Sequence, residues 1–230
     1  MTYRQARPNI LAMVGTLMLG LLASCSDRDD AMRYRLTVVV DTPSGTRSGS
    51  SIVESDFRNN GLTSGQAPIV DLGNGRYLFA LLTDPFSQKT LYRIMLQALR
   101  YPESKPPLEN PQGHTFRQAK RSKPKVTLRR ADYPMLVTFR DIGDAKSVLE
   151  VDPDNLVANF GPGYKLERIA IEVVDQDEPI TEGLEGLLKW LGPHALSRLS
   201  VGDPDTMQSV TEAPLSRQLS KLSFVYRSRK

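Results

Sequence analysis

The presence of a single cysteine, at position 25, is the feature that most restricts what this chain can fold into. With one cysteine and only two histidines, His114 and His194, the chain lacks the ligands for a disulfide framework, a zinc finger or an iron–sulfur cluster. Hydrophobic residues make up 40% and charged residues 24%, which excludes a disordered chain and a polytopic membrane protein. A length of 230 residues allows one domain or two small ones.

The N-terminal segment is typical of an export signal. It carries Arg4 and Arg7 without any acidic residue, and an apolar run then extends from Ile10 to Ala23. A membrane-spanning helix needs about 20 apolar residues, so this run is too short to be a standard anchor. We therefore expect residues 1–24 to be a signal peptide that is removed.

The end of that run resembles the lipobox of bacterial lipoprotein signal peptides, in the residues Leu22-Ala23-Ser24-Cys25. The resemblance implies that the Cys25 thiol receives a diacylglyceryl group and that the signal is cut between Ser24 and Cys25. The alternative is an ordinary secretory signal followed by a chance cysteine. An unpaired thiol is a liability in an oxidising periplasm, which argues against that alternative.

Lipidation would place the protein in the bacterial envelope, because two or more acyl chains give stable anchoring. Ser26 follows the cysteine, and in enteric bacteria an aspartate there favours retention in the inner membrane. We therefore expect the periplasmic face of the outer membrane. Asp27 comes next, so the inner membrane stays an alternative.

The net charge argues against a nucleic-acid partner. Thirty basic and 26 acidic residues give +4, which is too balanced to indicate a nucleic-acid binder. Removal of the signal peptide takes away Arg4 and Arg7, so the exported part is closer still to neutral.

Two β-hairpins are expected in the first half, residues 32–102, after a short lipidated tether at residues 25–31. Tyr34, Leu36, Val38 and Val40 fall on one face and Arg33, Arg35 and Thr37 on the other, which predicts a strand. Residues 46–54 are its expected hairpin partner. Asn74-Gly75 supplies the two positive φ angles of a type I′ turn between strands at 69–72 and 76–82. Residues 76–82 are apolar on both faces and should be a central strand.

A helix is expected from Asp84-Pro85 to about residue 101, with the aspartate as its N-cap. Residues 103–130 contain four prolines and few large apolar residues, so they predict a long basic loop or a linker between two subdomains.

The second half, residues 131–230, predicts strands at 135–140, 164–174 and 222–227, and it could form one domain with the first half. A helix should open at Asp152 and end at Gly161, and a short one should span residues 184–191. The whole pattern predicts an α+β fold with a mostly antiparallel sheet and a few short helices.

Three segments of the mature chain resemble uncharacterised proteobacterial lipoproteins of unknown function. They are RYRLTVVVDTPSGTRSGSSIVE, VDLGNGRYLFALL and VDPDNLVANFGPGYKLERIAIEV. This resemblance implies no activity, catalytic residue or cofactor.

The search for catalytic chemistry leaves the carboxylates as candidates. No nucleophile elbow, phosphate-binding loop or zinc-protease motif occurs, and His114 and His194 both lie in turn-like contexts. An acidic cluster could bind a divalent cation or serve as an acid–base pair, although a solvated turn is favoured. The cluster comprises Glu172, Asp175, Asp177, Glu178, Glu182 and Glu185.

The pairs Asp152/Asp154 and Asp203/Asp205 also resemble loose metal ligands, but helix capping explains the first pair better. No metal site and no cofactor is predicted.

A run of basic residues in the predicted loop is the second candidate site. It could contact lipopolysaccharide phosphates, anionic headgroups or an acidic partner, or it could be a solvated flexible loop. The residues are Arg117, Lys120, Arg121, Lys123, Lys125, Arg129 and Arg130.

Two functions follow as hypotheses. The first is a lipid-anchored structural or interaction module that binds another envelope component. The second is a carboxylate-dependent hydrolase of cell-wall glycans. Two carboxylates about 5–9.5 Å apart in an apolar-walled groove would favour the hydrolase, and carboxylates on a convex turn would favour the interaction module.

Overall fold

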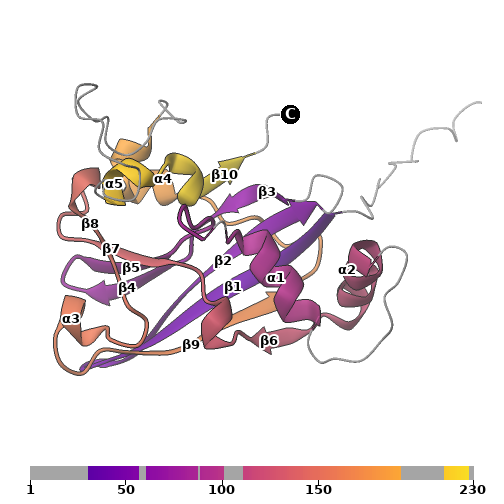
Figure 1. Ribbon diagram of the computed structural model, residues 1–230, viewed down its shortest axis with the longest axis horizontal. Coiled ribbons are helices and arrows are strands. Elements are labelled where there is room, and N and C mark those ends of the chain that lie inside the picture. The colour runs from indigo at the N-terminus through magenta and orange to yellow at the C-terminus, as the bar shows by residue number, and fades with distance from the viewer. Residues whose placement is uncertain (1–30, 57–60, 88, 101–110, 193–214, 228–230) are drawn as a thin grey trace, which may run out of the picture.

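The computed structural model describes residues 31–56, 61–87, 89–100, 111–192 and 215–227 (Figure 1). The predicted signal peptide, Cys25 and the tether up to residue 30 lie outside the described residues. His194, Asp203 and Asp205 also lie outside them, as does the side chain of His114.

The described residues form two antiparallel sheets with short helices, which confirms the α+β prediction. The larger sheet has the strand order β10-β3-β2-β1-β9-β6. Its strands are β1 (Ala31–Thr42), β2 (Gly45–Asp56), β3 (Gly61–Gln66), β6 (Lys125–Thr127), β9 (Lys165–Val173) and β10 (Val225–Arg227). The smaller sheet has the order β4-β5-β7-β8. Its strands are β4 (Ile69–Gly73), β5 (Arg76–Ala80), β7 (Leu136–Phe139) and β8 (Val148–Glu150).

The β1–β2 hairpin is the longest structural unit of the described chain. The two strands pair without interruption from Ala31 opposite Asp56 to Thr42 opposite Gly45. The predicted alternation is confirmed, because Tyr34, Leu36, Val38 and Val40 are all at most 1% exposed. Their common face forms one wall of the hydrophobic core.

The predicted Asn74-Gly75 hairpin is also confirmed. Asn74 and Gly75 have φ angles of 55° and 70°, which suit a type I′ turn. β5 lies between β4 and β7, and Leu78 and Phe79 are completely buried. The prediction of a central strand here is therefore confirmed, although the strand ends at Ala80.

The smaller sheet crosses the larger one at Gly49. An ideal Cβ at this position would lie 1.7 Å from the carbonyl oxygen of Ile69 and 2.9 Å from the nitrogen of Val70. No side chain fits in that space, so the glycine allows the start of β4 to pass directly over β2. The chain makes this crossing just after β3 ends at Gln66.

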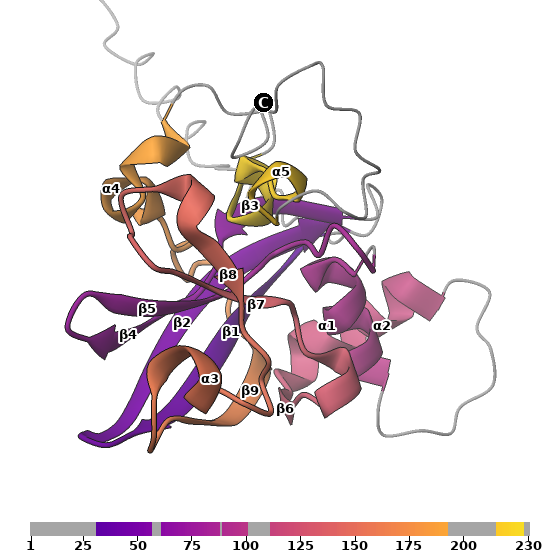
Figure 2. The ribbon, with the colours of Figure 1, turned by 60° about the vertical axis from the view of Figure 1, so that its left-hand side comes forward.

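Two helices cover the rest of the core. α1 (Leu91–Arg100) contacts β3 and β6, and α2 (Pro111–Ser122) packs against α1 and β1. Figure 2 shows both helices on the right of β1 and β2, and β4 and β5 of the smaller sheet on the left. The helical spacing of Leu91, Ile94 and Met95 is confirmed, since these side chains are at most 2% exposed.

Both predicted helix starts at aspartates are wrong. Asp84 Oδ1 instead accepts hydrogen bonds from the backbone of Phe86 and Ser87, at 2.8 and 3.2 Å, and α1 begins seven residues later. Asp152 Oδ1 accepts from the backbone of Asp154 at 2.9 Å. An aspartate can close such a local turn without a helix after it, and sequence alone does not separate the two outcomes.

The prediction of a loop or linker over residues 103–130 is wrong for the part that the structure describes. α2 occupies residues 111–122, with Ala119 only 4% exposed, and β6 pairs with β9. Strands from both halves of the chain share each sheet, so this stretch does not separate two subdomains. β6 is stabilised by hydrogen bonds to β9 rather than by an apolar pattern of its own, which explains why the sequence does not reveal it.

The remaining elements are single turns. They are α3 (Val157–Phe160), α4 (Leu184–Leu187), α5 (Leu215–Gln218) and the 3-10 turns η1 (Arg130–Asp132), η2 (Ala145–Ser147), η3 (Lys189–Leu191) and η4 (Lys221–Ser223). The helix predicted over 184–191 is thus divided into α4 and η3. The last predicted strand is shorter than expected, because only Val225–Arg227 pair with β3.

An aromatic cluster joins the C-terminal part to the smaller sheet. The Phe224 ring lies 6.1 Å from Phe79, 5.9 Å from Phe139 and 5.7 Å from Trp190, measured between ring centroids. The Trp190 indole nitrogen donates to the carbonyl of Ile142 at 3.0 Å. Within the described ranges, no helix is long and apolar enough to cross a membrane.

We predict that Gly49→Ala lowers the free energy of unfolding by about 3 kcal/mol or more, because the added methyl group overlaps the Ile69 carbonyl. Urea unfolding of residues 26–230, which include every described element, measures this change. The neighbouring Ser50→Ala is the control and should change stability by less than about 0.5 kcal/mol. Equal stability of the two variants would contradict the close crossing.

Candidate functional site

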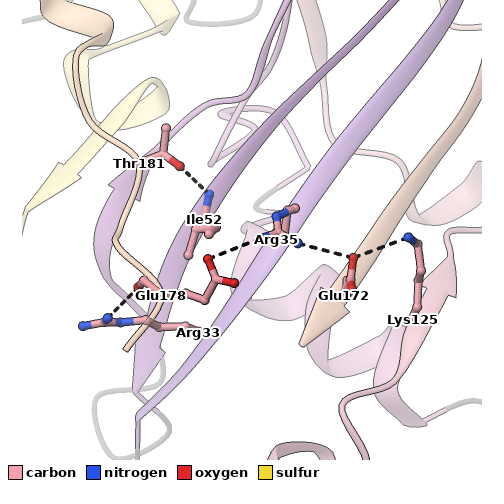
Figure 3. Close-up of polar contacts among 7 residues, drawn as sticks. All are labelled: Arg33, Arg35, Ile52, Lys125, Glu172, Glu178 and Thr181. Carbon is pink, nitrogen blue, oxygen red and sulfur yellow. Dashed lines mark hydrogen bonds and ion pairs between the residues drawn. The ribbon is translucent and has the colours of Figure 1, made fainter. Parts of the chain in front are cut away.

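The two charged segments singled out in the sequence meet on the outer face of the larger sheet. Lys125 and Glu172 are directly opposite on β6 and β9, and Glu172 and Arg35 are directly opposite on β9 and β1. The Glu172 carboxylate lies 3.4 Å from Lys125 Nζ and 3.6 Å from Arg35 Nη1. Figure 3 shows this row of alternating charges, which follows from strand register.

The chain after β9 lies across the same face and extends the row. Arg35 Nη2 is 3.4 Å from the Glu178 carboxylate, so one guanidinium bridges Glu172 and Glu178 (Figure 3). Arg33 Nη1 donates to the Glu178 carbonyl at 2.7 Å, and Arg33 Nε donates to Glu54 at 3.0 Å. The predicted acidic turn is therefore fixed to β1 by two arginines.

The same segment reaches the edge of β2 at Ile52. Ile52 N–H donates to Thr181 Oγ1 at 2.8 Å, and Thr181 N–H donates to the Ile52 carbonyl at 3.1 Å. The Leu184 N–H then donates to Gln66 Oε1 at 2.9 Å. We call residues 174–184 the strap, because they cross the outer face and are bonded to β1, β2 and β3.

The C-terminal end of the acidic cluster is also paired. Glu185 lies 2.6 Å from Lys221 Nζ and 3.5 Å from Arg227 Nη2, and Glu182 lies 3.8 Å from Arg227 Nη2. The hydrogen bond from Lys221, followed by the positive charges of Lys221 and Arg227, lowers the pKa of Glu185 below its ordinary value. These pairs connect α4 with η4 and β10.

At least four of the seven basic candidates have carboxylate partners among the described residues. Lys123 contacts Asp175, Lys125 contacts Glu172, and Arg129 donates to the buried Asp132 at 2.6 Å. Arg117 and Arg121 are exposed on α2, and Lys120 beside them is half-buried. More than half of the basic residues predicted to contact an anionic surface are thus paired with carboxylates of the same chain.

Arg130 is the fourth paired residue, and it occupies the loose metal-ligand pair Asp152/Asp154. Its guanidinium lies 3.3 Å from Asp152 and 2.9 Å from Asp154. The hydrogen bond from Arg130 lowers the pKa of Asp154, and the same bond raises the pKa of Arg130. The two carboxylates are therefore paired with a cationic side chain, which argues against their use as metal ligands.

These contacts argue against acid–base chemistry at the acidic cluster. A general acid needs a raised pKa, whereas bound cations favour the ionised form. Within the described part of the chain, no group of three histidine, cysteine, aspartate or glutamate side chains could hold a metal. A shallow hollow of about 10 Å³ lies beside Gln66, Thr181 and Arg227, far below the 300 Å³ or more typical of ligand pockets.

The pairing of these charges could not be read from their spacing, because the partners are up to 143 residues apart. A partial signal exists in β1, where Arg33 and Arg35 share the polar face of the predicted strand. Such residues indicate a charged sheet face. They do not identify β6, β9 and the strap as its neighbours.

We predict that Glu185 contributes to stability only above its folded pKa. Because that pKa is lowered, the unfolded chain binds the proton first as pH falls, so the contribution is complete well above pH 4.5 and is lost as the pH falls from there through the folded pKa. Relative to Glu185→Gln, the natural protein should be more stable by about 1 kcal/mol at pH 6, and this difference should shrink towards pH 3. Urea titrations at both pH values measure it, and a constant difference would contradict the ion pair.

Comparison of the chain with protein-family models, with curated proteins and with solved structures finds no match. The functional argument therefore depends on the sequence and on the geometry described above.

Proposed function

We propose that this protein is a lipid-anchored module of the bacterial envelope that binds another envelope component. The observation that carries the proposal is the short distance along the chain between Cys25 and the sheet. β1 begins at Ala31, six residues after Cys25. Six residues span at most about 20 Å when fully extended, so a lipid on Cys25 would hold the Ala31 end of the sheet close to the bilayer.

This end of the fold suits an anionic membrane surface. The Arg33 carbonyl accepts from Val174 N–H, and the Pro124 carbonyl accepts from Val173 N–H, so the end of α2 lies near the start of β1. Figure 1 places α2 beside that end of β1. Its exposed Arg117 and Arg121 would each contribute about 1 kcal/mol near anionic headgroups.

Binding is the better-supported role for the folded part. The carboxylates that a glycan hydrolase would need are held by Arg35, Lys125, Lys221 and Arg227 instead. The Arg35–Glu178 ion pair and the hydrogen bonds of Ile52 and Gln66 join the strap to three strands and stabilise a rigid surface, which suits recognition of a partner. The outer membrane is the proposed location, on the basis of Ser26 after the lipidated cysteine.

We predict that Cys25→Ser abolishes lipidation and signal cleavage, because it removes the thiol that accepts the diacylglyceryl group. In cells fed labelled palmitate, the natural protein should take up the label and the variant should not. The variant should also stay about 24 residues longer and remain at the inner membrane, held by the apolar run from Ile10 to Ala23.

Ser26→Ala is the matched control, since it leaves the cysteine in place and should be labelled and cut. Fractionation of the natural protein then separates the two membranes. Recovery of an unlabelled natural protein from the soluble periplasm would refute the anchoring.

A further inference from the structure

The edge of β2 that faces away from β1 has different hydrogen-bond partners along its length. Near its end, residues Glu54–Asp56 pair with β3. At Ile52, the strap takes over through Thr181. Within the described chain, no hydrogen bond is made by the outward backbone groups from Ser50 back to Thr46, although the opposite edge of β2 pairs with β1 throughout.

The alternation of an antiparallel strand tells which backbone groups of this stretch point away from β1. Ile52 directs both its N–H and its carbonyl outward, to Thr181. Successive residues of an antiparallel strand alternate between the two edges, so Ser50, Ser48 and Thr46 also point outward. They present three N–H donors and three carbonyl acceptors, and all three residues are exposed.

Apart from the charge of Arg47, this edge lacks the usual protection against strand pairing. Natural edges are shortened, bulged, or blocked by lysine and proline. Here the β1–β2 register continues without a bulge to the turn, and the stretch Gly45–Ser51 carries one charged residue, Arg47. Arg47 is exposed and makes no ion pair with any described residue.

We infer that Thr46–Ser50 is a strand-addition site for an extended segment of another envelope protein. This deepens the proposed function by naming its surface and the chemistry of its partner. The added strand would satisfy the outward groups of Thr46, Ser48 and Ser50. An acidic side chain beside Arg47 would supply the missing countercharge, and the small serine side chains leave the outer face open to varied residues.

A second copy of the chain fits this edge less well under the proposed anchoring. Antiparallel pairing of two β2 strands would turn the two Ala31 ends in opposite directions, so the copies could not both be anchored in one leaflet. The edge lies at the turn between Thr42 and Gly45, at the opposite end of β1 from Ala31. A strand of 12 residues is about 40 Å long, which places the site away from the bilayer.

The experiment is site-specific photo-cross-linking in cells that produce the full-length protein. A photo-reactive amino acid replaces Ser50, and adducts are identified by mass spectrometry. We expect an adduct with a different protein, cross-linked within an extended segment. The same amino acid at Glu167, an exposed residue of β9, is the placement control and should not give this adduct.

Two substitutions of Ser48, one that removes its backbone N–H and one that keeps it, test strand addition itself. Ser48→Pro removes one outward N–H and should lower the yield of the Ser50 adduct about fivefold or more, whereas Ser48→Ala should preserve it. Arg47→Glu should also lower the yield, and Arg47→Lys should keep most of it. Ser48 N–H bonds to no described residue, so the proline variant should unfold at the same urea concentration as the natural protein.

Several results would overturn the inference. They are the absence of an adduct at Ser50, an adduct that is the protein's own dimer, and an adduct whose yield Ser48→Pro leaves unchanged. If the proposed lipid anchor is wrong, the observation is different: the natural protein takes up no palmitate label. An unlabelled protein whose adduct is still lost in Ser48→Pro would refute the lipid anchor and retain the strand-addition site.

Discussion

The close crossing at Gly49 is the constraint on which the rest of the structure depends. Because the Ile69 carbonyl occupies the space where a Cβ would lie, β4 starts directly over β2 and the smaller sheet stacks on the larger one. The completely buried residues Val53 and Val70 belong to one hydrophobic cluster that spans both sheets. A larger residue at position 49 would separate the sheets and expose part of that core.

The arrangement of the charged side chains on the outer face follows from the strand register of the larger sheet. Strand register places Lys125, Glu172 and Arg35 in one row, and Arg35 then holds Glu178 of the strap. In the sequence, Lys125 belongs to a basic run, and Glu172 and Glu178 belong to an acidic run, so the two runs suggest separate functions. In the fold, Lys123 and Lys125 of the basic run are ion-pair partners of the acidic run. Partly exposed pairs of this kind contribute little each, but together they fix the position of the strap.

The sequence predicts the parts of the fold that are specified locally. The alternation from Tyr34 to Val40 and the positive φ angles demanded at Asn74-Gly75 are local signals, and both predictions are confirmed. β6 has one apolar residue, Val126, and owes its existence to β9, which is more than 40 residues away. The candidate site was unpredictable for the same reason, since it depends on which strands are neighbours.

The strap and the open edge are parts of one arrangement. Thr181 bonds to both backbone groups of Ile52, and the next outward residue along β2 is Ser50. The strap therefore ends the protected part of the edge at a defined residue. Because β2 pairs with β1 without interruption down to Gly45, the edge beyond Ile52 is already extended before any strand is added. A pre-ordered edge loses little conformational entropy when a strand is added. The free energy of the few main-chain hydrogen bonds is therefore not offset by a cost of ordering the edge, and it contributes to binding.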